Sequence, residues 1–143
     1  MKTTRPRLRL PSPALIISCV ALFSALGGGA YAATSLSSSS PTWHNGTYLN
    51  GWSTYGSSYA HAGYAKDSNG VVHLRGGVGG GSAEEVFQLP VGYRPTHYVY
   101  TTIYTEGGTQ GSLEITPTGA VEPFGGSSTS YSGLDGVSFV AGE

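Results

Sequence analysis

Histidines, carboxylates and serines are the residues of this 143-residue sequence that could carry out chemistry. The sequence contains no Gly-x-Ser-x-Gly turn, which would present a serine nucleophile in a hydrolase. The acidic residues show no pair that spacing marks as the two carboxylates of a glycosidase. The histidines are too widely spaced for a metal-binding His-x-x-x-His pair, and they are His44, His61, His73 and His97. We therefore expect no catalytic residue, no metal and no other cofactor.

The aromatic side chains are the second group with functional potential. Tyrosine and tryptophan combine an apolar ring with a polar tip, so they can pack a small core, cover a subunit interface or line a ligand site. Carbohydrate sites place such rings beside amide and hydroxyl groups. Six aromatic residues are concentrated between Trp43 and Tyr64 among glycine, asparagine and serine. Our candidate ligand-binding residues are Trp43, Tyr48, Trp52, Tyr55, Tyr98, Tyr100 and Tyr104, together with His73 and Arg75.

The elements that must position these residues are predicted to be strands. Abundant glycine, serine, threonine and tyrosine is typical of β-structure, and no amphipathic helical spacing follows residue 33. Residues 67–70, Asp-Ser-Asn-Gly, predict a hairpin turn, because asparagine and glycine tolerate positive φ. After that turn, Val72 and Leu74 share one strand face, and Val71, His73 and Arg75 share the other. We interpret residues 76–81 as a flexible glycine-rich crossover.

A proline-rich corner follows a short predicted strand at 86–89. Proline fixes φ, so Pro90 and Pro95 mark residues 89–95 as architectural. Arg94 either pairs with an acid or caps backbone carbonyls to lock the corner, or it contacts a ligand carboxylate or hydroxyl. The predicted structural corner comprises Pro90, Gly92, Tyr93, Arg94 and Pro95.

The rest of the chain alternates short strands with turns. Residues 97–105 form a strand with Tyr98, Tyr100 and Tyr104 on one face, and its other face covers the core. Residues 106–111 are predicted to be a loop, and 112–116 a strand. A turn at 117–119 leads to a returning strand at 121–124, in which Pro123 indicates a sheet edge. A polar loop at 125–133 and a last strand at 137–140 complete an all-β fold. Six to eight such strands predict a single antiparallel β-sandwich or jelly-roll-like domain.

The N-terminal region has the layout of a secretory signal. Basic residues precede an apolar run at 14–26 and a small-residue cleavage site at 30–32. We expect a signal peptide at 1–32, a flexible serine-rich linker at 33–42 and a binding module at 43–143, which makes the protein secreted and extracellular. An uncleaved membrane anchor is the alternative for the first segment.

Signal cleavage changes the charge and removes the single cysteine, Cys19. The remaining chain carries Lys66, Arg75 and Arg94 against eight acidic residues. This balance excludes the basic patch that a nucleic-acid backbone requires. It also leaves no disulfide to support an exported domain, so an oligomer is a plausible supplement to its core. We expect no membrane contact after cleavage.

The order of these motifs resembles C-terminal head modules of phage tail and receptor-binding fibres and related small exported bacterial β-sandwich proteins. The shared pattern is a turn, then Val-x-Leu-Arg-Gly at 72–76, a glycine-rich link, a short strand, Leu-Pro-x-Gly-Tyr-Arg-Pro at 89–95 and two antiparallel strands. The resemblance covers residues 60–140. It implies a sandwich fold, contact with a cell surface and a tendency to form trimers. Unlike those fibres, this chain has a predicted signal peptide and no shaft or collagen-like repeat.

Three functional hypotheses follow. The first is a secreted, non-catalytic module that recognises a cell-surface glycan or an extracellular protein through an aromatic and polar face. The second is an assembly subunit that forms a homotrimer or docks into a larger secreted particle through the same tyrosines. The third and weakest is a small hydrolase.

Overall fold

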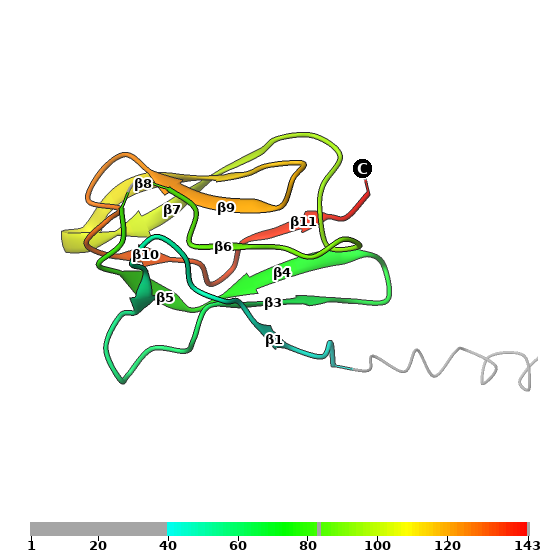
Figure 1. Ribbon diagram of the computed structural model, residues 1–143, viewed down its shortest axis with the longest axis horizontal. Helices are drawn as coiled ribbons and strands as arrows, with labels where there is room; N and C mark the ends of the chain where they lie inside the picture. Colours follow the sequence, from blue (N-terminus) through cyan, green and yellow to red (C-terminus); the bar gives the residue numbers. More distant parts are fainter. Residues whose placement is uncertain (1–39, 83, 143) are drawn as a thin grey trace, which may run out of the picture. The chain divides into compact units, whose positions relative to one another are not determined.

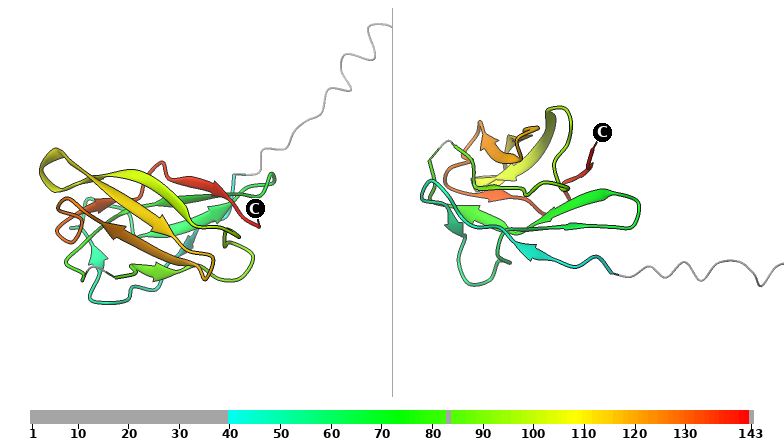
Figure 2. Two further views of the ribbon diagram at one scale, coloured as in Figure 1. Left: turned by 90° about the horizontal axis from the view of Figure 1, so that it is seen from above. Right: turned by 45° about the vertical axis from the view of Figure 1, so that its right-hand side comes forward.

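Two antiparallel sheets packed as a sandwich make up the protein in a computed structural model that describes residues 40–82 and 84–142 (Figures 1 and 2). The four-stranded sheet has the order β1 (His44–Asn45), β3 (Gly63–Lys66), β4 (Val71–Arg75), β11 (Ser138–Val140). The seven-stranded sheet has the order β2 (Ser53–Thr54), β5 (Gly77–Gly79), β10 (Ser132–Gly133), β7 (Val99–Thr105), β8 (Thr109–Ile115), β9 (Ala120–Phe124), β6 (Phe87–Gln88). The predicted all-β class is confirmed.

The core lies between the sheets and follows the two-residue period of the strands. Val72 and Leu74 of β4 are buried, whereas His73 and Arg75 between and after them are partly exposed. In the other sheet, the inward side chains of β7, β8 and β9 alternate with outward ones in the same way. The largest fully buried side chains are Phe87, Leu89, Leu113, Ile115 and Leu134. Alternation of apolar and polar residues therefore fixes which face of each sheet is inward.

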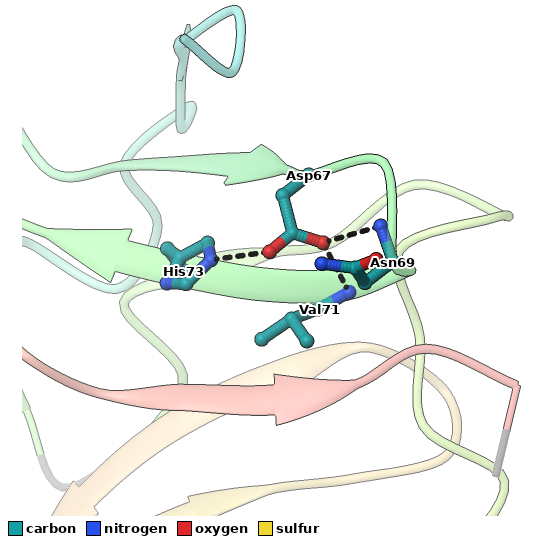
Figure 3. A network of polar contacts seen from close by, with 4 residues as sticks. All are labelled: Asp67, Asn69, Val71 and His73. Atoms are coloured by element: carbon teal, nitrogen blue, oxygen red, sulfur yellow. Dashed lines mark hydrogen bonds and ion pairs between the residues drawn. The ribbon is translucent and has the colours of Figure 1, made fainter. Parts of the chain in front are cut away.

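The β3–β4 hairpin turn is held by one carboxylate (Figure 3). Asp67 Oδ1 accepts hydrogen bonds from the backbone N–H groups of Asn69 (2.9 Å) and Val71 (3.0 Å). Its Oδ2 lies 3.3 Å from His73 Nε2. Gly70 has φ 84°, which glycine adopts without strain. The hairpin predicted at 67–70 is therefore confirmed.

We expect Asp67→Asn to remove a pH-dependent part of the stability. Burial raises the pKa of Asp67, but the hydrogen bonds from Val71, His73 and Asn69 outweigh it and leave the pKa below the ordinary 3.8. A depressed carboxyl pKa stabilises the fold above the unfolded-state value, and this contribution is lost as pH falls through the folded-state value. The variant should be less stable than the parent at neutral pH, and the difference should vanish in acid. Urea unfolding across pH 2 to 7 measures it, and a constant difference would contradict the assignment.

Residues 77–79 of the glycine-rich link form the buried strand β5, so the predicted crossover at 76–81 is present, but this part of it is ordered and not flexible. The chain leaves the four-stranded sheet at Gly76 (φ 106°), and β5 pairs with β2 and β10 in the other sheet. A Cβ on Gly77 would lie 2.6 Å from the Tyr59 ring and 3.0 Å from the Tyr131 ring. Glycine is required here because aromatic rings rest directly on the backbone.

Three other elements differ from their predicted form. The β7–β8 connection is a short 3₁₀ turn, η1 (Glu106–Gly108), so β8 begins at Thr109 and not at 112. Tyr131, predicted to lie in a polar loop, is buried against other tyrosines. Pro123 lies in β9, which has β8 on one side and β6 on the other. Because β6 pairs only with Ala120 and Val121, no strand lies beside Pro123 on the β6 side. The missing N–H of Pro123 therefore costs no ladder hydrogen bond on that side.

The predicted signal peptide at 1–32 and nearly all of the predicted linker lie outside the described residues. Within residues 40–82 and 84–142, no helix is long and apolar enough to cross a membrane.

Candidate binding face

The outer face of β7, β8 and β9 brings the predicted tyrosines together. Antiparallel pairing sets Tyr100 opposite Glu114, and Glu114 opposite Glu122. The next row across the sheet is Thr102, Ser112 and Phe124. Directly opposite residues of an antiparallel pair share one face, so these rows form one continuous surface. We define the aromatic face as Tyr98, Tyr100, Thr102, Tyr104, Gln110, Ser112, Glu114, Glu122 and Phe124.

Four rings on this face are exposed to solvent. Tyr98, Tyr100 and Tyr104 are 60%, 62% and 59% exposed, and Phe124 is 42% exposed. The Tyr98 and Tyr100 rings are nearly parallel, with centroids 6.3 Å apart and an interplanar angle of 16°. Phe124 meets Tyr100 edge-on, also at 6.3 Å. Figure 2 shows the three long strands that carry these residues side by side in its left view. The rings therefore form a patch that the fold leaves uncovered, which is typical of an interaction surface.

Carboxylates give this aromatic surface a negative charge. Burial raises the pKa of Glu122, and the neighbouring Glu114, Glu85 and Glu84 raise it further. A hydrogen bond to Glu114 raises the pKa of the Tyr100 hydroxyl, and the charge of Glu114 adds to that effect. The aromatic rings are thus combined with hydrogen-bond acceptors and with charge of one sign.

Tyr104 stands between two hollows at the other end of the face. One has a volume of about 500 Å³ and is lined by the β7 segment 101–104 and by residues 135–138. The second has a volume of about 260 Å³ and is lined partly by Gly108, Thr109 and Gln110. Tyr104 also meets Tyr131 edge-on at 5.8 Å. These hollows provide room for a ligand beside an exposed ring.

Of the predicted contact residues, Trp52 packs inside the protein and Tyr48 is half-buried against its core. Trp52 is 4% exposed, and its indole N–H donates to the Glu84 carbonyl at 3.0 Å. The Tyr48 hydroxyl is 2.8 Å from the Thr54 hydroxyl and accepts from the Ala62 N–H, while its ring stacks on His61 at 4.4 Å. Trp52 is therefore corrected to a core residue, because its ring is needed to fill the space above Gly81.

Tyr55 belongs to a tyrosine cluster beside the aromatic face, next to Tyr104. Its ring meets Tyr131 at 4.7 Å and Tyr59 at 5.4 Å, both edge-on. Its hydroxyl donates to Glu106 Oε2 at 2.9 Å. This hydrogen bond raises the pKa of Tyr55. Tyr55 therefore supports Tyr104 through Tyr131 and is itself half-buried.

Trp43, His73 and Arg75 lie on the other sheet. The Arg75 guanidinium stacks over the Trp43 ring, with Cζ 4.5 Å from its centroid. With Asp67 and Asp135 they line a groove of about 600 Å³. His73 and Arg75 share the outward face of β4, so the structure separates this group from the exposed tyrosines.

The proline-rich corner is tied down by backbone and side-chain hydrogen bonds. Arg94 Nε donates to the Leu89 carbonyl at 2.7 Å, which fits the architectural role. Lys66 Nζ donates to the Gly92 carbonyl and lies 5.1 Å from the Tyr93 ring centroid. The Gly142 N–H donates to the Arg94 carbonyl, so the corner also anchors the chain beyond β11.

Sequence reasoning missed Phe124 and the two glutamates as parts of the face. Alternation in β9, with Val121 and Pro123 inward, would have placed Glu122 and Phe124 outward. The register that sets Glu122 beside Glu114 and Tyr100 required the tertiary structure. Among residues 40–82 and 84–142, no three His, Cys, Asp or Glu side chains are grouped as metal ligands.

Comparison with known proteins identifies a structural neighbour. No protein-family model matches the sequence, and no curated protein matches it. The receptor-binding protein (gp15) of Listeria phage PSA superposes with a TM-score of 0.61 and 22% sequence identity. The alignment covers 90% of this chain and 80% of that one. The two proteins share a fold. At this identity the similarity establishes the fold. It supports the resemblance, based on the order of the sequence motifs, to head modules with a β-sandwich fold.

Proposed function

We propose that this protein is a secreted, non-catalytic binding module that recognises a glycan on a cell surface through the aromatic face. The observation that carries the proposal is the exposure of Tyr98, Tyr100, Tyr104 and Phe124 on one sheet face. Apolar rings gathered on one exposed face typically mark an interaction surface.

The chemistry of the face supports a sugar ligand. A tyrosine ring packs against the apolar C–H side of a sugar ring, and its hydroxyl remains free to hydrogen-bond. Thr102, Gln110 and Ser112 add hydroxyl and amide groups between the rings. The name of the structural neighbour, a receptor-binding protein, agrees with a contact role at a cell surface. Strands hold these groups more rigidly than loops would, which lowers the entropic cost of binding.

We expect Tyr98→Ala to weaken glycan binding at least about tenfold, because Tyr98 is exposed and stacks on Tyr100, and aromatic residues are typical hot spots of binding. Protein purified from cells expressing the full chain would be screened on a glycan array, and affinities for each bound glycan measured by calorimetry. Val91→Ala is the control, because Val91 is a largely exposed apolar side chain in the 89–95 corner, outside the aromatic face. An absence of binding to every surface polymer, or equal affinities for parent and Tyr98→Ala, would refute the proposal.

Self-association is a second candidate function, favoured by the same exposed rings. A homotrimer or a larger secreted assembly would bury Tyr98 and Tyr100 between copies of the chain. Light scattering distinguishes the two functions: a trimer that Tyr98→Ala and Tyr100→Ala convert to monomer supports assembly. A monomer at high protein concentration supports glycan recognition.

A further inference from the structure

We infer that the aromatic face binds a glycan bearing free ammonium groups, as in an amino sugar without N-acetylation. This inference rests on the proposed function and specifies the ligand of the same face. It is based on a group of neighbouring carboxylates that does not help to stabilise the fold.

Glu114 and Glu122 stand directly opposite each other on adjacent strands. Like charges in this position destabilise a sheet. The segment at 84–85 adds two more carboxyl groups near Glu122. It is held there by the Trp52 indole, which bonds the Glu84 carbonyl, and by the Asn50 amide, which donates to the Glu85 carbonyl at 3.0 Å. The protein therefore fixes repulsive charges in place, which is typical of a functional site.

None of the basic side chains in residues 40–82 and 84–142 neutralises this charge. Lys66 is bonded to the Gly92 carbonyl, Arg75 is stacked on Trp43, and Arg94 is bonded to the Leu89 carbonyl. The field above the face therefore attracts cations and repels acidic polymers. Burial raises the pKa of Glu122 most, and the charges of Glu114, Glu85 and Glu84 raise it further.

The rings beside the carboxylates suit an ammonium group in particular. Tyr100 lies next to Glu114 in the sheet register, and Phe124 meets Tyr100 edge-on. Aromatic faces attract cations through their electron-rich centres, and carboxylates add direct charge pairing. A sugar ring stacked near Tyr98 and Tyr100 would place an amino substituent within reach of this group. A neutral N-acetyl group would gain the stacking alone.

The test compares two probes that differ in this charge: short glucosamine oligomers and N-acetylglucosamine oligomers of equal length. Protein from the full chain would be titrated with each at about pH 6, above the ordinary pKa of a carboxyl group. We expect glucosamine oligomers to bind about three- to thirtyfold more tightly, in line with one exposed cation–π contact and one exposed ion pair. The preference should shrink as salt is added.

Glu122→Gln should remove most of the preference while leaving the melting temperature equal or higher, because a repulsion is lost. Glu106→Gln, with the same change in net charge at the β7–β8 turn, should keep the preference. Equal affinity for both oligomers, or loss of preference in both variants, would overturn the inference while Tyr98-dependent binding still supported a glycan-binding module. Oligolysine binding as tightly, with the same dependence on Tyr98, would identify a basic polypeptide as the partner and overturn the assignment to a glycan.

Discussion

Phe87→Ala is expected to lower the free energy of unfolding by about 3–5 kcal/mol, the range for removing a buried aromatic ring. The Phe87 side chain has no exposed surface, and its ring stacks on Tyr64 with centroids 6.2 Å apart. The backbone at Gly46 rests on the same ring, so closely that a Cβ there would lie 2.6 Å from Cγ. Rigid strands on both sides prevent the cavity from collapsing. Because a small domain has only about 5–15 kcal/mol of stability, the loss should be a large part of the total.

Urea unfolding of parent and variant measures this loss, and Phe124→Ala provides a matched control. Phe124 carries the same ring on the outer face of the same sheet, where it is partly exposed, so its removal should cost less than about 1 kcal/mol. The control variant should also bind ligand more weakly, since Phe124 belongs to the aromatic face. Similar losses of stability in the two variants would show that Phe87 does not lie in a packed core.

Gly79→Ala is expected to destabilise the protein by about 1–3 kcal/mol through overpacking. A Cβ at this position would collide with the Ser130 carbonyl and would lie 2.9 Å from the Tyr55 ring. The carbonyl belongs to the backbone beside β10, so it cannot rotate away as a side chain would. The tyrosine cluster of Tyr55, Tyr59 and Tyr131 would also have to move, which would disturb the support of Tyr104.

Thermal unfolding of Gly79→Ala against Gly133→Ala measures the effect. At Gly133 the nearest atom to a new Cβ is the Tyr131 hydroxyl at 3.2 Å, the end of a side chain that can shift. We expect the second substitution to lower the melting temperature much less than the first. A neutral Gly79→Ala would mean that the link is as adaptable as the sequence suggests.

The amino-acid sequence determined the local parts of this structure. Alternating side chains fixed the inward faces of β4, β7 and β8, because a strand has a period of two residues. Gly70 and Asp67 fixed the turn at 67–70, since glycine accepts the positive φ and the carboxylate accepts two backbone hydrogen bonds. The same period placed Tyr98, Tyr100 and Tyr104 on one exposed face, which is the larger part of the candidate site.

Only the tertiary structure decided which distant residues share a surface. Strand register set Glu122 and Phe124 beside Glu114 and Tyr100, and a shift of one residue would have reversed every face. It also buried Trp52 and placed Trp43 with Arg75 on the other sheet. These outcomes could not be predicted from the sequence, because tyrosine and tryptophan are equally suited to a core and to a solvent-exposed surface. Their use depends on which backbone lies against them. In this protein the glycine backbone of residues 77–81 lies against Tyr55, Tyr59, Tyr131 and Trp52.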